Sequence, residues 1–86
     1  MRFGVQFNGN VPAGATRRWF THSWSEAFNV IWAMVPTGPA GSGPAQLEWK
    51  VQSTRQAGAP VRWFIEVQNL TGVPVDFQAR YAILNA

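Results

Sequence analysis

The sequence contains no cysteine, a single histidine and only four carboxylate side chains among its 86 residues. The absence of cysteine excludes a disulfide framework. A structural zinc ion takes a full set of Cys, His or carboxylate ligands, which this composition can hardly provide. No cofactor motif is present, so we expect neither a metal nor a cofactor. A chain of this size is then stabilised by aromatic packing or by homo-oligomerisation.

Long apolar segments are also missing. The longest uninterrupted apolar run, Val30 to Val35, is far shorter than the about 20 residues that a membrane-spanning helix requires. The N-terminal sequence MRFGVQFNGN lacks the apolar segment of a secretory signal. We therefore expect a soluble chain with no transmembrane segment. The sequence does not indicate its compartment.

Apolar and polar residues alternate along several segments, as in half-buried β-strands. The predicted strands are Met1–Asn8, Ala15–Thr21, Ala27–Val35, Gln46–Thr54, Val61–Asn69 and Val75–Leu84. Turn-forming residues separate them, and the Gly/Pro-rich stretch 36–45 is predicted to be a surface loop. We predict one domain over residues 1–86, an all-β antiparallel sandwich of about six strands, jelly-roll-like or immunoglobulin-like in general form.

The strand phases assign side chains to faces. Residues in phase with inward aliphatic side chains are predicted to form the core, and these include Trp32, Trp49, Trp63, Phe77 and Tyr81. The last two strands are predicted to form a hairpin in which Val67 pairs with Phe77. The strand Ala27–Val35 is apolar on both faces, which predicts a second cover, a partner subunit in a homo-oligomer.

Catalytic patterns are weak. Adjacent strand residues such as His22 and Ser23 point to opposite faces, which disfavours a catalytic pair. The carboxylates Glu48 and Glu66 have cations on their own strands, so surface ion pairs explain them better than a glycosidase site does. The glycine-rich segment GPAGSG lacks the lysine of a phosphate loop. We therefore expect a protein that is not an enzyme.

Some aromatic residues lie on charged faces or in polar segments, where packing in the core does not explain them. Trp19 shares a face with Arg17, Trp24 lies in the polar stretch THSWSE, and Phe64 lies on a charged face. An exposed ring offers an apolar surface to the C–H face of a sugar, and neighbouring polar groups supply directed hydrogen bonds. The predicted ligand-binding residues are Arg17, Trp19, His22, Trp24 and Glu26, at one end or edge of the sandwich.

The leading hypothesis is a non-enzymatic, lectin-like module that binds carbohydrate and gains avidity from homo-oligomerisation. A second hypothesis is a structural protein whose exposed aromatic side chains form a subunit interface. A third is binding of anionic lipid or nucleic acid through Arg17, Arg18, Arg55 and Arg62. The net charge is only +3 and is spread along the sequence, which argues against nucleic acid.

Overall fold

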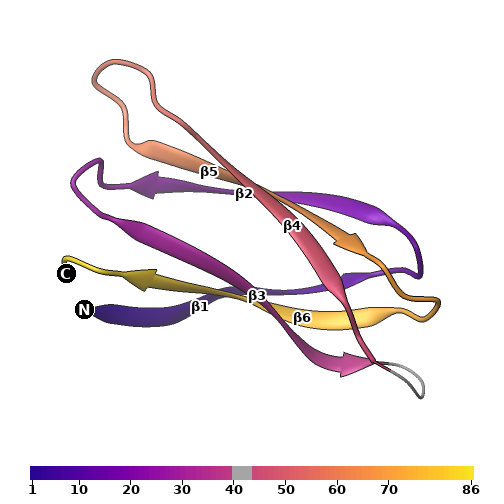
Figure 1. Cartoon of the computed structure of the whole chain (residues 1–86). Helices are drawn as coiled ribbons and strands as arrows, with labels where there is room; N and C mark the ends of the chain where they lie inside the picture. The colour runs from indigo at the N-terminus through magenta and orange to yellow at the C-terminus, as the bar shows by residue number, and fades with distance from the viewer. Residues whose placement is uncertain (40–43) are drawn as a thin grey trace.

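The computed structural model describes residues 1–39 and 44–86, and these residues form six strands in two three-stranded antiparallel sheets (Figure 1). The strands are β1 (Arg2–Val11), β2 (Thr16–Trp24), β3 (Val30–Pro39), β4 (Leu47–Thr54), β5 (Val61–Asn69) and β6 (Val75–Ile83). The prediction of an all-β chain is confirmed. Within the described ranges there is no helix that is long and apolar enough to cross a membrane.

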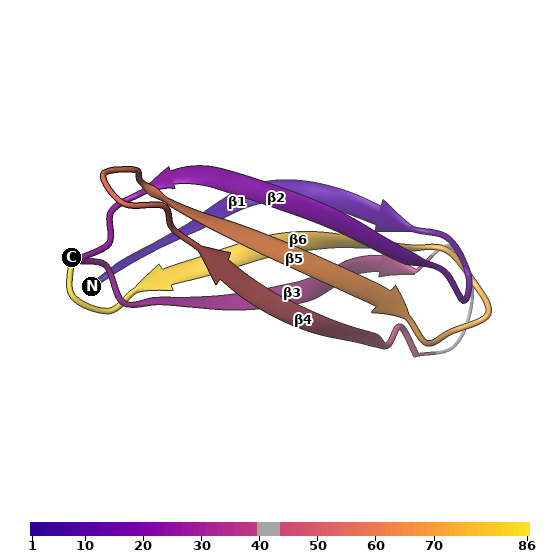
Figure 2. The same cartoon turned by 90° about the horizontal axis from the view of Figure 1, so that it is seen from above.

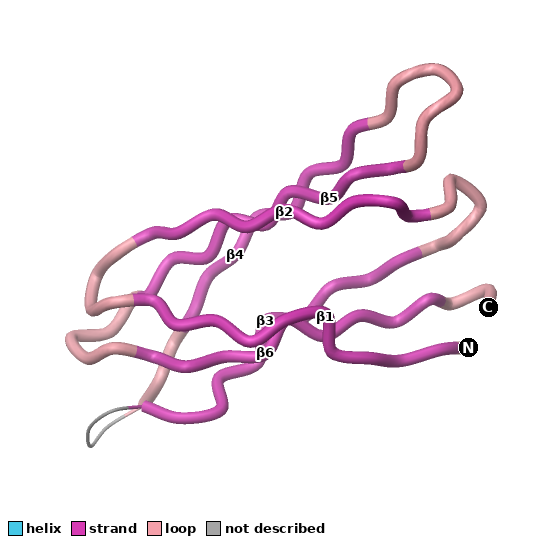
Figure 3. Tube along the Cα trace, turned by 180° about the vertical axis from the view of Figure 1, so that it is seen from behind, coloured by secondary structure: helices cyan, strands magenta, loops and turns pink. Residues whose placement is uncertain are grey.

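One sheet has the strand order β1-β6-β3 and is called here the 1-6-3 sheet; the other has the order β2-β5-β4 and is called the 2-5-4 sheet. Every connection between consecutive strands changes sheet, except the one from β4 to β5. Strands of both sheets run along the long axis of a molecule that measures 46 × 25 × 15 Å (Figure 2). The termini lie together at one end, and the β4–β5 loop lies at that same end (Figure 3).

Aromatic side chains fill the space between the sheets in two clusters. In the first cluster, Trp24 makes edge-to-face contacts with Trp32 and Tyr81 at ring-centroid distances of 5.4 and 5.2 Å. In the second, Trp19 of the 2-5-4 sheet stacks on Phe7 of the 1-6-3 sheet at 5.5 Å and meets Phe77 edge-on at 5.2 Å. These geometries are the ones that aromatic pairs prefer. The sheets are therefore joined through their inward rings.

The predicted core is confirmed for most of its aromatic residues. Trp32 and Phe77 are buried, and Trp63 and Tyr81 are half-buried and pack against the core. The prediction is wrong for Trp49, whose exposed fraction is 39%. Strand β4 lies at the edge of the 2-5-4 sheet, so a large side chain on it is covered on one side only.

A β-bulge in β1 changes which side chains face inward. The predicted strand Met1–Asn8 ends too early, because β1 continues to Val11. The register with β6 shifts between Val5 and Phe7, so that Phe3 pairs with Ala82 on the outer face. The extra residue moves the preceding side chains to the opposite side of the sheet. Phe3 and Val5 therefore point to solvent, and only Phe7 of the alternating apolar residues points inward.

The predicted hairpin of the last two strands is wrong. Val61–Asn69 pairs with β2 and β4, whereas Val75–Ile83 pairs with β1 and β3 in the opposite sheet. The predicted loop 36–45 also differs, because β3 continues to Pro39; residues 40–43 lie outside the described part of the chain.

Asn69 anchors the crossing from β5 to β6. Its buried side-chain amide donates hydrogen bonds to the carbonyl oxygens of Val11 at 3.0 Å and Val73 at 2.7 Å. Its side-chain oxygen accepts a hydrogen bond from the backbone N–H of Thr71 at 2.9 Å. One buried side chain thus satisfies backbone groups at the β1–β2 and β5–β6 connections, both of which cross from one sheet to the other.

We predict that Asn69→Ala lowers the free energy of unfolding by about 2–4 kcal/mol, because several buried backbone groups lose their partners. Urea unfolding followed by circular dichroism measures the change. The matched control is Asn8→Ala, which removes the same side chain from an exposed position on β1 and should cost less than about 0.5 kcal/mol. Equal losses in the two variants would contradict the role given to Asn69.

Candidate functional site

The predicted site residues do not form one site, because most of them lie along the length of β2. Arg17 lies near its start, where the guanidinium donates a hydrogen bond to the carbonyl oxygen of Asn10 at 3.1 Å. Trp24 ends the strand, about 23 Å away at the usual rise of about 3.3 Å per residue. Arg17 and Trp24 therefore lie toward opposite ends of the molecule, too far apart to contact one small ligand.

The two tryptophans of the predicted site face inward. Trp24 is only 9% exposed, and its indole N–H donates a hydrogen bond to the Thr21 hydroxyl at 2.8 Å. A register shift between Thr21 and Trp24, with Ser23 at a φ of 67°, turns the Trp24 ring toward the core. Trp19 is half-buried between Phe7 and Phe77. The prediction that these rings are exposed is wrong for Trp24, which is buried. Trp19 is half-buried rather than exposed.

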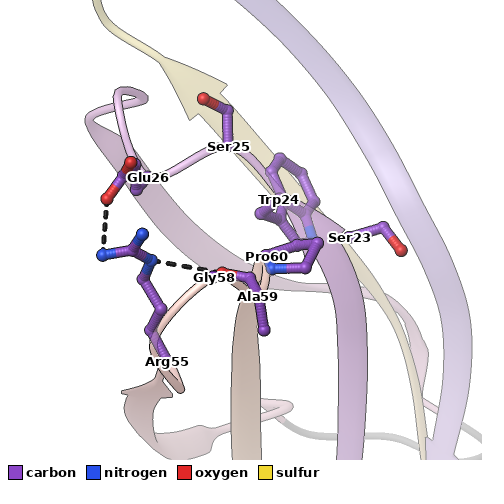
Figure 4. Close-up of a pocket in the computed structure, with 8 residues that line it drawn as sticks. All are labelled: Ser23, Trp24, Ser25, Glu26, Arg55, Gly58, Ala59 and Pro60. Atoms are coloured by element: carbon purple, nitrogen blue, oxygen red, sulfur yellow. Dashed lines mark hydrogen bonds and ion pairs between the residues drawn. The ribbon is translucent and has the colours of Figure 1, made fainter.

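Trp24 and Glu26 do line a common hollow of about 450 Å³ at the end of the molecule that carries the termini (Figure 4). Short turns shape its two walls. In one wall Phe28 N–H donates to the Ser25 carbonyl oxygen, and in the other Ala59 N–H donates to the Gln56 carbonyl oxygen. The hollow is lined by Ser23, Trp24, Ser25, Glu26, Arg55, Gly58, Ala59 and Pro60.

The charged groups of this hollow bind each other. A guanidinium nitrogen of Arg55 lies 2.6 Å from a carboxylate oxygen of Glu26, and Arg55 Nε donates to the carbonyl oxygen of Ala59 at 3.1 Å (Figure 4). A ligand entering the hollow would have to compete with this ion pair. His22 does not line the hollow; its Nδ1 lies 2.9 Å from the Ser23 hydroxyl oxygen. In this hollow the Trp24 ring is thus almost fully buried, and Arg55 and Glu26 are paired with each other.

Exposed aromatic rings gather instead on the outer face of the 2-5-4 sheet. Phe20 on β2 pairs directly with Phe64 on β5, and their ring centroids lie 6.2 Å apart at an interplanar angle of 32°. The His22 ring lies 6.4 Å from that of Phe20 at 39°. Phe20 is 62% exposed. We call Phe20, Phe64 and His22 the aromatic row.

Polar and charged side chains border the aromatic row. Gln52 on β4 pairs with Phe64, which places both on the outer face. In the adjacent row of the sheet Glu66 lies between Arg18 on β2 and Lys50 on β4, and an Arg18 guanidinium nitrogen is 3.4 Å from a Glu66 carboxylate oxygen. On the other side Arg62 shares the outer face of β5 with Phe64. This face thus offers ring surfaces together with hydrogen-bond donors and acceptors in fixed positions.

Phe20 is the residue that the sequence prediction missed. A signal for it exists, since Phe20 alternates with Arg18 and His22 in the same way that Phe64 alternates with Arg62 and Glu66. A lone phenylalanine on an otherwise polar strand face predicts an exposed ring. What the sequence does not contain is the pairing of β2 with β5, which brings the two rings together.

The arrangement is suited to binding. Rings and mixed charges on an open sheet face can hold an extended ligand through stacking and hydrogen bonds. Among the described residues, no three His, Cys, Asp or Glu side chains gather in a way that could hold a metal ion.

We predict that Trp24→Ala lowers the free energy of unfolding by about 3–5 kcal/mol, since it removes a buried ring from the core. Phe20→Ala, which removes a ring from an exposed face, should cost less than about 1 kcal/mol. Urea unfolding followed by circular dichroism compares the two variants. A Trp24→Ala protein as stable as Phe20→Ala would show that Trp24 is not part of the core.

Comparison with known proteins gives no relative on which to base a function. No protein-family model matches the chain, and no curated protein or solved structure matches it. The function is therefore inferred from the residues of the site.

Proposed function

We propose that this protein is a non-enzymatic carbohydrate-binding module, lectin-like in action, whose binding surface is the outer face of the 2-5-4 sheet. The observation that carries the proposal is the pairing of the exposed Phe20 ring with the half-buried Phe64 ring, whose centroids lie 6.2 Å apart, with polar side chains bordering them. Of the residues that the sequence singles out, His22 belongs to this surface, and Phe20 and Phe64 replace Trp19 and Trp24 as the stacking rings.

The chemistry of the surface suits a sugar chain. A pyranose presents an apolar C–H face and a rim of hydroxyl groups, and the aromatic row presents ring surface beside hydrogen-bonding groups. Gln52 both donates and accepts hydrogen bonds, and Glu66 accepts them. The surface is an open sheet face, which allows a chain of several sugars to lie along it. A single contact of this kind is weak, so several copies of the site would raise the overall affinity.

The proposal includes a homo-oligomer that forms through the outer face of the 1-6-3 sheet. The residues of this apolar patch are Phe3, Val5, Ile31, Ala33, Val35 and Ala82. Phe3 and Ile31 both pair with Ala82 and are 72% and 56% exposed. Exposed apolar side chains such as Phe3, Val5 and Ile31 are typical of interaction surfaces, and the patch surrounds one exposed cation, Arg80, which pairs with Val5 and Ala33. A second copy on this face would supply the cover that the apolar strand β3 lacks.

The proposal also includes a jelly-roll-like sandwich. The last strand, β6, lies beside the first, and β5 lies beside the second, while the chain crosses repeatedly between the sheets. This order supports a jelly-roll arrangement with fewer strands than the usual form. It leaves both outer faces open, one for the ligand and one for the partner copy.

A second candidate function is that of an assembly protein in which the aromatic row itself is a subunit interface. The exposure of Phe20 supports it as well, because an exposed ring is also a common interface anchor. The two functions predict different effects of removing the Phe20 ring: loss of carbohydrate binding in one case and loss of self-association in the other. Loss of self-association in Phe20→Ala, with no glycan bound by the wild type, would favour assembly.

We predict that Phe20→Ala and Phe64→Ala each weaken binding to a soluble oligosaccharide by about two- to twelvefold, because stacking on a ring is worth about 0.5–1.5 kcal/mol beyond the area that it buries. A panel of neutral and acidic oligosaccharides identifies the ligand, and isothermal calorimetry gives the affinity. The matched control is Phe3→Ala, which removes an exposed ring from the opposite sheet and should leave the affinity for a monovalent ligand unchanged. If Phe20→Ala and Phe64→Ala both bound the oligosaccharide with wild-type affinity, the proposal would be overturned.

We predict that Ile31→Glu converts the oligomer to a monomer, because it places a charge in the apolar patch on each copy. Sedimentation equilibrium of the wild type and the variant measures the mass. Thr16→Glu, which adds the same charge at an exposed position of the 2-5-4 sheet, should leave the mass unchanged. A monomeric wild type would remove the oligomer from the proposal.

A further inference from the structure

We propose that the ligand of the aromatic row is an acidic polysaccharide, a chain of uronic acid sugars whose carboxylates bind Lys50 and Arg62. This inference rests on the proposed carbohydrate-binding function and names the class of sugar. It is carried by the placement of the cationic side chains around the rings and by the ion pairs that they do and do not form.

The cations stand on both sides of the rings. Residues 62, 64 and 66 follow one another on the outer face of β5, so Arg62 is one step of about 7 Å from Phe64 on one side and Glu66 is one step away on the other. Arg18 and Lys50 flank Glu66 on the neighbouring strands. A chain that stacks on the rings along β5 therefore has a cation within reach before and after them.

Lys50 and Arg62 can form ion pairs with a ligand. Among the described residues, ion pairs form between Arg18 and Glu66 and between Arg55 and Glu26, and neither includes Lys50 or Arg62. Both side chains lie on exposed residues. A carboxylate of the ligand would meet two cations that form no ion pair within the described part of the chain, although Lys50 faces Glu66 across the strands. Arg62 could bind it through two parallel N–H···O bonds.

The same face disfavours nucleic acid. Two carboxylates, Glu48 and Glu66, share it with the cations. They accept hydrogen bonds from sugar hydroxyls, which a strand of DNA does not offer along its length. They also leave the cations of this face few and interspersed, whereas nucleic-acid-binding surfaces cluster them. Sparse cations among carboxylates and rings fit a polymer that is rich in hydroxyl groups and carries carboxylates.

The test compares an oligogalacturonate with its methyl ester, which has the same sugar rings and no charge. Calorimetry should show that the wild type binds the acid about three- to tenfold more tightly than the ester, as expected for exposed ion pairs. High salt should remove this preference, because it screens exposed charges. The double variant Lys50→Gln/Arg62→Gln should bind the acid no better than the ester.

Arg80→Gln is the matched control, since Arg80 is an exposed cation on the outer face of the other sheet, and this variant should keep the preference for the acid. Equal affinity of the wild type for acid and ester would overturn the acidic ligand and leave the carbohydrate function standing. Binding to no sugar, neutral or acidic, would overturn both. Tighter binding to a single-stranded DNA oligonucleotide than to the oligogalacturonate would replace the acidic sugar with nucleic acid.

Discussion

Packing of aromatic rings between the two sheets is the interaction on which the rest of this structure depends. Without cysteine, the chain relies on contacts such as Phe7–Trp19 and Trp24–Trp32 to join sheets that share no ladder of hydrogen bonds. Each ring buries about 150–250 Å² when it is covered, so a few of them supply much of the apolar burial of a small chain. The buried amide of Asn69 adds a polar link between the same two layers.

Because the inward rings hold the sheets together, they are not available to a ligand, and the outward faces are free to differ. The 1-6-3 sheet presents apolar side chains, and the 2-5-4 sheet presents Phe20, Phe64 and His22 among charged groups. Two faces of different chemistry on opposite sides of one thin molecule allow self-association and ligand binding without competition. In the proposed module the outer face of the 1-6-3 sheet forms the oligomer, which provides avidity, and the outer face of the 2-5-4 sheet binds the ligand.

On the outer face of the 2-5-4 sheet, the positions of the charged side chains matter more for ligand binding than the net charge does. The whole chain carries a net charge of +3, which by itself indicates little about a partner. Cross-strand pairing gathers Arg18, Lys50 and Glu66 into one row beside the rings. Glu66 forms an ion pair with Arg18, and Lys50, which faces Glu66 from the other side, forms none among the described residues. The selectivity proposed for this surface therefore depends on which cations the fold leaves without a partner.

The sequence by itself determined the strands and most of the core, because alternation with a period of two is a local property of the chain. The segment Val61–Asn69 is a strand with the predicted limits, and Trp32 and Phe77 are buried as their phase requires. Only the tertiary structure decided the bulges near Val5 and Ser23, the sheet to which each strand belongs, and the edge position of Trp49. A bulge reverses every side chain on one side of it, and strand pairing joins residues far apart in sequence. Local pattern therefore predicted exposed tryptophans, and the fold instead exposed Phe20 beside the half-buried Phe64.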